Sequence, residues 1–98
     1  MKITYYGHSC FGVEAGGKML LFDPFITPNE LAKDINVEAI KADYIFISHG
    51  HEDHIFDAVS IAIRTNATVV SNWEIVAWLG KKGVSKGHPM NLGGSWMF

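Results

Sequence analysis

Three histidines and two acidic residues stand within the seven positions of SHGHEDH, residues 48–54. Neutral imidazole and carboxylate are ligands of zinc, iron and manganese, and no cysteine lies nearby to indicate a Cys-rich structural zinc site. The alternative is a solvated polar turn, which would explain one histidine better than three. The stretch therefore predicts a metal site that is catalytic rather than structural.

The position of this stretch in the chain predicts how its side chains are aimed. DYIFIS, residues 43–48, is a continuous apolar run, which is typical of a central strand covered on both faces. At the end of such a strand, His49 and His51 point to the same side, beyond the carboxyl edge of the sheet. Asp53 and His54 follow on the turn into a helix and face a neighbouring point. Two adjacent ions could then share the motif.

The chain before the motif predicts an antiparallel meander of three strands. Gly16 and Gly17 can adopt the positive φ angles of a two-residue hairpin turn. Asp23 precedes Pro24, which cannot continue a ladder, so Asp23 stands at a strand end. The predicted strands are 2–6, 10–15 and 18–23, followed by a connecting loop with short helix over 24–42.

The chain after the motif changes to helical spacing and predicts a βαβα unit, and so an α/β fold. Asn72 is placed to cap the second helix, and Gly83 to end it. Gly93 and Gly94, between two apolar pieces, indicate a hairpin. The predicted elements are a helix over 55–65, a strand over 68–71, a helix over 73–82 and a hairpin within 84–98.

Composition narrows the class of protein. With 98 residues, of which 48% are hydrophobic, the chain is one domain at most. A net charge of −2 without a basic stripe argues against nucleic acid as a partner, and no apolar run is long enough to span a membrane. The single cysteine, Cys10, suits a reducing compartment, so a cytoplasmic location is expected. The abrupt end at SWMF predicts a fragment of a longer protein.

HGHEDH, residues 49–54, resembles the His-x-His-x-Asp-His signature of the metallo-β-lactamase superfamily. ITYYGHSCFGVEAGGKMLLFDPF and GHPMNLGGSW are similar to its metal-dependent hydrolase branch related to ascorbate-6-phosphate lactonase. That resemblance implies a four-layer αβ/βα sandwich made of two similar halves. Residues 1–98 would form a single partial domain, the N-terminal αβ half, with a sheet that carries its helices on one face.

The resemblance also implies a function and its metal ligands. His49 and His51 would bind one divalent ion, and Asp53 and His54 a second, with a bridging water that attacks as hydroxide. Zinc is the favoured metal, with manganese or iron as alternatives. The substrate would be a small molecule with an ester, lactone or phosphoester bond. Asp53 would also have a catalytic role, by orienting the attacking water.

Two further residues are candidates for a role around the metals. The resemblance places Asp23 where a carboxylate accepts the second N–H of a histidine ligand, although a plain turn former is the alternative. His8 stands where the branch has a histidine near the mouth of the active site. It either contacts substrate or metal, or it only closes a turn between two strands.

The remaining ligands of such a site would come from a second half that this chain does not contain. Alone, these residues should therefore be inactive or weakly active. Their exposed apolar sheet face should bind the complementary C-terminal half or pair with a second copy. The alternative function is a non-catalytic metal-binding or interaction module that lacks the second half.

Overall fold

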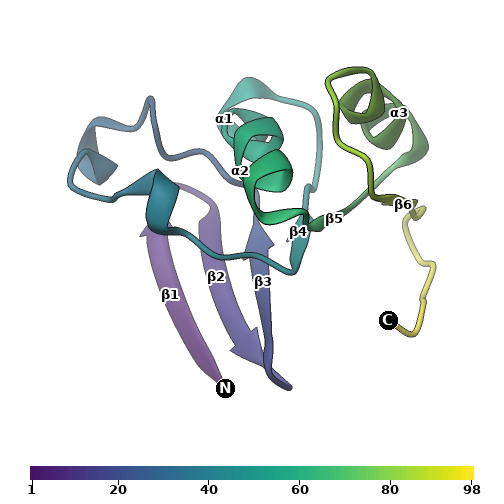
Figure 1. Ribbon diagram of the computed structural model, residues 1–98, viewed down its shortest axis with the longest axis horizontal. Helices are drawn as coiled ribbons and strands as arrows, with labels where there is room; N and C mark the ends of the chain where they lie inside the picture. The colour runs from purple at the N-terminus through teal and green to yellow at the C-terminus, as the bar shows by residue number, and fades with distance from the viewer.

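A computed structural model describes residues 1–98 and shows one mixed sheet in the order β1-β2-β3-β4-β5-β6 (Figure 1). The first three strands pair antiparallel, and each strand after β3 runs parallel to its neighbour. The carboxyl ends of the four parallel strands consequently meet at one edge. The strands are β1 (Lys2–Gly7), β2 (Cys10–Ala15), β3 (Lys18–Phe22), β4 (Tyr44–Phe46), β5 (Thr68–Ser71) and β6 (Gly87–Pro89).

The predicted meander is confirmed, including its turn. Ala15 pairs with Lys18, and between them Gly16 and Gly17 have φ angles of 58° and 76°. Positive φ at both central positions matches the right-handed twist of the two strands, and glycine adopts it without steric cost.

The helices follow the predicted order with one change. The helix predicted over 55–65 begins earlier and is interrupted at Phe56 and Asp57, because Asp57 leaves the helical region with φ −92° and ψ 2°. Asn72 caps the last helix as predicted, its side chain accepting a hydrogen bond from the Ile75 amide. The elements are α1 (Glu52–Ile55), α2 (Ala58–Thr65) and α3 (Trp73–Lys81), with the short 3-10 turns η1 (Glu30–Ala32) and η2 (Val37–Ala39).

One face of the sheet packs against the helices and forms the core. Leu21, Ile45 and Val69 lie side by side in register across β3, β4 and β5, and each is at most 1% exposed. Ala58 and Ile61 of α2 belong to the same buried cluster. The predicted α/β sheet with helices on one face is therefore confirmed (Figure 1).

The prediction that both faces of the strand at 43–48 are covered is wrong. Ile45 and Ile47 are buried, but Tyr44 and Phe46, which point the other way, are only partly buried. Within these residues the helices cover one face, and the opposite face carries a stacked pair, Phe22 and Phe46, with ring centroids 4.9 Å apart. The central position of the strand, between β3 and β5, is as predicted.

The predicted C-terminal hairpin is also wrong. β6 pairs parallel with β5, and the Met90 amide donates to the Ser71 carbonyl at 2.8 Å, which extends that parallel pairing. α3 lies directly on β6, where a Cβ at Gly87 would collide with the side chain of Val76. The chain around Gly93 and Gly94 makes a turn, with the Gly94 amide bonded to the Asn91 carbonyl, but no strand follows.

None of the helices combines the length and the apolar character that crossing a bilayer requires.

Candidate metal centre

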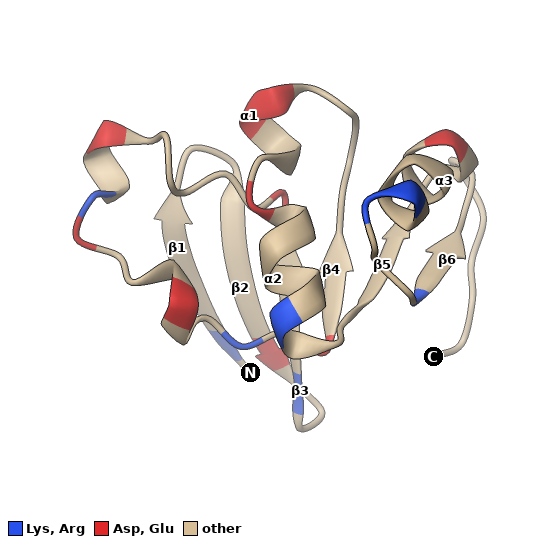
Figure 2. Ribbon diagram, turned by 45° about the horizontal axis from the view of Figure 1, so that its top comes forward, with Lys and Arg blue, Asp and Glu red and all other residues tan.

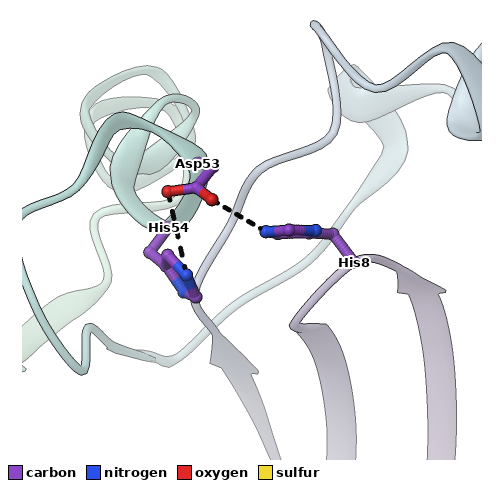
Figure 3. A group of neighbouring side chains, drawn as sticks. All are labelled: His8, Asp53 and His54. Carbon is purple, nitrogen blue, oxygen red and sulfur yellow. Dashed lines mark hydrogen bonds and ion pairs between the residues drawn. The ribbon is translucent and has the colours of Figure 1, made fainter.

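The residues of the motif gather at the carboxyl edge of the parallel strands. Phe22 and Phe46 are in register at the ends of β3 and β4, so the residues that follow these strands lie close together. His51 is the N-cap of α1, which places Asp53 and His54 in the first turn of that helix. The loop between β1 and β2 brings His8 to the same place from the other side (Figure 3).

Asp23 is the acceptor at the centre of this edge. Its Oδ1 accepts from the Ser48 amide at 2.7 Å, and its Oδ2 accepts from the Ser48 hydroxyl at 2.7 Å. The same Oδ2 lies 3.0 Å from Nδ1 of His54. Asp23 has a φ of 43°, a left-handed conformation that aspartate tolerates better than most residues. It therefore turns the chain and also contacts His54, which is the contact that a role in supporting a histidine ligand would need.

These contacts determine which ring nitrogens carry protons. His54 Nδ1 faces a carboxylate and so carries a proton, which leaves Nε2 with a free lone pair. The Ser48 hydroxyl has one proton, which it donates to Asp23, so at 2.8 Å from His49 Nδ1 it accepts. His49 Nδ1 therefore also carries a proton. Asp23, directly and through Ser48, thus holds two histidines in the tautomer that binds a metal through Nε2.

His8 contacts the motif through Asp53. Its Nε2 lies 3.0 Å from Asp53 Oδ2, and both side chains are partly exposed. His8 has a φ of 53°, its carbonyl accepts from the Tyr5 hydroxyl, and its ring packs edge-on against Phe25 at 5.3 Å. Because Nε2 donates to a carboxylate, His8 orients Asp53 in this arrangement while it also closes the turn between β1 and β2.

The surroundings of Asp53 favour its ionised form. Partial desolvation raises its pKa, but the hydrogen bond from His8 and, whenever its ring is doubly protonated, the charge of the neighbouring His54 outweigh this and hold the pKa below its ordinary value. Its Oδ1 lies 3.8 Å from His54 Nε2. One ligand atom each from His8, Asp53 and His54 lie within 4.8 Å of one another, a spacing that one cation could bridge (Figure 3).

The other two histidines of the motif adjoin this group. The ring centroid of His49 lies 4.6 Å from that of His51 and 4.0 Å from that of His54. The pair predicted for one ion, His49 and His51, is therefore adjacent to the pair predicted for the other. α1 carries acidic residues and neither Lys nor Arg, so the local field favours cations (Figure 2).

Two residues of this centre were missed by the sequence analysis. Ser48 stands inside the motif, but only the hydrogen bonds reveal that it connects Asp23 to His49. Asp57 has no role in the sequence-based prediction, whereas in the structure its buried carboxylate bonds to the loop after β3. No spacing rule in the sequence connects Asp57 with residues thirty positions earlier.

Comparison with known proteins shows which family the chain is similar to. Residues 2–91 match a family model described as "Beta-lactamase superfamily domain". The chain is 56% identical over 98 residues to a UPF0173 metal-dependent hydrolase of Methylacidiphilum infernorum and 52% identical to one of Flavobacterium johnsoniae. Both alignments cover the whole chain but only 43% of the relative, so the chain spans less than half the length of these relatives.

Solved structures with the same fold include two hydrolases. Igni18, described as a novel metallo hydrolase from the archaeon Ignicoccus hospitalis, superposes with a TM-score of 0.83 at 43% identity. The alignment covers 94% of this chain and 40% of Igni18. An isothiocyanate hydrolase from Delia radicum gut bacteria has a TM-score of 0.73 at 21% identity, covering 93% of this chain and 41% of that one, and supports the fold alone.

Proposed function

The chain belongs to the beta-lactamase superfamily, and we propose that it supplies the metal-binding part of a hydrolase that cleaves an ester, lactone or phosphoester bond in a small molecule. The observation that carries this proposal is the convergence of His49, His51, Asp53 and His54 at one sheet edge, with the free nitrogens of two of these histidines fixed by Asp23. Zinc is the metal we favour, with manganese and iron as alternatives.

The donor set fits such ions. Imidazole nitrogens and a carboxylate are suitable ligands, and His54 and His49 are held in the tautomer that leaves Nε2 free to bind a metal. His49 and His51 would hold one ion, and Asp53 and His54 the other. Each pair leaves positions for ligands from the rest of a longer protein, as catalytic metal sites normally have about three protein ligands.

Three residues at the proposed metal site would have different roles in the reaction. When bound, the ions would lower the pKa of water and polarise the carbonyl or phosphoryl oxygen of the substrate. Asp53 remains a carboxylate because its pKa is lowered, so it can accept a hydrogen bond from the attacking water and orient it. His8 orients the carboxylate of Asp53, and Asp23 restrains the ring of His54 directly and that of His49 through the Ser48 hydroxyl.

Metal analysis tests the first half of the proposal. The protein, in the full length that its gene encodes, should hold one or two divalent ions per chain by mass spectrometry. His51→Ala should lose at least one of them. The matched control is His88→Ala, because His88 lies on β6 against Trp96 rather than in the motif, and this variant should keep its metal. A wild-type protein free of Zn, Mn and Fe after purification and reloading would disprove the proposal.

Hydrolysis assays test the second half. A nitrophenyl ester, a simple lactone and a nitrophenyl phosphodiester present the three bond types, and at least one should be cleaved. The activity should disappear with a chelator and return with the metal. If the protein binds metal but cleaves none of the three, a non-catalytic metal-binding module becomes the better description.

The sheet face that the helices leave open carries exposed apolar side chains. Ile3 and Tyr5 are each 61% exposed on it, and Phe11 is 38% exposed. We propose that the C-terminal half of a longer protein covers this face, because the relatives are more than twice as long as the chain. Pairing with a second copy is the alternative. Light scattering on residues 1–98 separates the two, since a monomer at micromolar concentration excludes self-pairing.

A further inference from the structure

A buried carboxylate that the proposed hydrolase does not use stands three residues after the motif. Asp57 precedes α2 and is only 4% exposed. Aspartate is rarely buried unless its oxygens are hydrogen bonded, because removing a carboxylate from water is costly. Every contact of Asp57 therefore bears on the reason for its burial.

The carboxylate of Asp57 is bonded to the loop that follows β3. Its Oδ2 accepts from the amides of Ile26 and Thr27 at 2.7 and 2.9 Å, and its Oδ1 accepts from the Thr27 hydroxyl at 2.5 Å. The Asp57 amide donates to the Pro24 carbonyl at 2.9 Å. Asp57 thus makes four hydrogen bonds to residues 24–27, which hold this loop against the residue that precedes α2.

The loop at 24–27 touches both sides of the candidate metal centre. Asp23, directly before it, holds Ser48 and His54. Phe25, within it, packs edge-on against the ring of His8. A shift of the loop would therefore move the acceptor of His54 and the support of His8 together.

We propose that Asp57 is a positioning residue of the metal centre, which holds the loop at 24–27 so that Asp23 can orient His54 and Ser48. It does not touch the metals or the substrate itself. This role deepens the proposed hydrolase function and rests on it for its catalytic meaning. The competing explanation is that Asp57 only stabilises the fold, as many buried hydrogen-bonded carboxylates do.

Three variants and a control separate these explanations. Asp57→Ala removes all the side-chain bonds, Asp57→Asn keeps an acceptor for the loop amides, and Thr27→Ala removes only the hydroxyl contact. Ile61→Ala is the matched control, because Ile61 is fully buried on the same helix but belongs to the core rather than to the loop contacts. It should destabilise the protein without displacing Asp23.

The first readout does not need a metal. In nuclear magnetic resonance spectra of the full-length protein, the His54 Nδ1 proton and the Ser48 amide report on their bonds to Asp23. Asp57→Ala should shift or broaden both signals, Asp57→Asn and Thr27→Ala should do so less, and Ile61→Ala should leave them in place. Unchanged signals in folded Asp57→Ala, or equal changes in Ile61→Ala, would overturn the positioning role.

The second readout is the affinity for zinc alone. Asp57→Ala should weaken it about tenfold, with partial recovery in Asp57→Asn, whereas Ile61→Ala should stay within about twofold of wild type. A wild-type protein without zinc affinity would refute the hydrolase proposal but leave the spectra to decide on the positioning of Asp23. Zinc affinity that is equal in wild type and Asp57→Ala would refute the positioning role alone.

Discussion

The candidate metal centre contains two histidine–aspartate pairs with the same nitrogen–oxygen distance but different exposure to solvent. His54 and Asp23 lie 3.0 Å apart with side chains 14% and 12% exposed. His8 and Asp53 also lie 3.0 Å apart, but with side chains 41% and 49% exposed. By distance alone the two pairs are equivalent, but water and salt have free access only to the pair of His8 and Asp53.

The two pairs also differ in how firmly each partner is held. Asp23 is fixed by two further bonds from Ser48, and the loop after it is fixed by Asp57. Asp53 lies on the open end of a four-residue helix, and His8 on a turn between two strands. The buried pair is therefore suited to hold His54 in one tautomer, whereas the exposed pair orients Asp53 by a single contact that water can replace.

The largest effect should come from removing the buried acceptor. Asp23→Ala leaves three donors without their partner and places alanine at a φ of 43°, so it should lower the free energy of unfolding by about 3 kcal/mol. Urea denaturation measures this loss. Asp23→Asn, which tolerates the same backbone conformation, should lose clearly less. Equal stability of Asp23→Ala and wild type would mean that the buried pair contributes no more than an exposed one.

The next effect concerns metal affinity rather than stability. In Asp23→Asn the new amide group can donate to His54 Nδ1, which would shift the proton of that ring to Nε2 and block the metal-binding nitrogen. Zinc affinity should fall about 10- to 100-fold, measured by competition with a chromophoric chelator.

The control for this change is an identical substitution at the opposite edge of the sheet. Asp43 accepts from the Met19 amide at 2.8 Å, so Asp43→Asn alters a similar bond far from the metal centre. Its zinc affinity should match that of wild type. Equal losses in the two variants would show that the tautomer of His54 is not what Asp23 controls.

Much of this architecture could be predicted from the sequence because it depends on local patterns. Gly16 and Gly17 specify a turn by their φ angles, Asn72 caps a helix with its own side chain, and Asp23 precedes a proline at a strand end. Each of these signals acts within a few residues. The i, i+2 spacing of His49 and His51 is equally local, and their rings are neighbours in an edge-to-face arrangement, with centroids 4.6 Å apart.

The rest depends on contacts between distant segments, which no local pattern encodes. How far Tyr44 and Phe46 are buried depends on which elements pack on the sheet face that the helices leave open. Their apolar character indicates only that this face is suited for burial. Asp57 meets Ile26 across thirty-one positions, and His8 meets Asp53 across forty-five. Gly93 and Gly94 form a turn, but a hairpin also needs a partner strand.

A smaller effect on stability should come from Cys10, whose thiol is buried and is influenced by the charges of Asp57 and Asp23. Burial raises its pKa to about 12, opposed by a hydrogen bond with the Phe25 backbone and supported by the charges of Asp57 and Asp23. The folded protein therefore keeps the thiol proton at pH 10, whereas the unfolded chain, with a thiol pKa of 9.0, releases it. Stability from this group is complete below pH 9 and is lost as the pH rises toward 12.

The stability difference between wild type and Cys10→Ala isolates this effect from other titrating groups. At pH 10, about one unit above the pKa of the unfolded thiol, the difference should be roughly 1 kcal/mol smaller than at pH 7. Urea denaturation at both pH values measures it. If the stability difference between the two proteins does not change with pH, the thiol of Cys10 ionises in the folded state. The surroundings of Cys10 would then be more open to water than its burial indicates.

The smallest effect should come from breaking the exposed pair. His8→Asn is the suitable change, because asparagine tolerates the φ of 53° but its short side chain cannot take the place of the imidazole against Asp53. The loss of stability should be less than roughly a fifth of that in Asp23→Ala, and it should vanish in about 0.5 M salt. The Asp23→Ala loss should persist at that salt concentration, because the buried pair is poorly screened. If salt reduced both losses of stability equally, the difference in burial would not affect how much the two pairs contribute to stability.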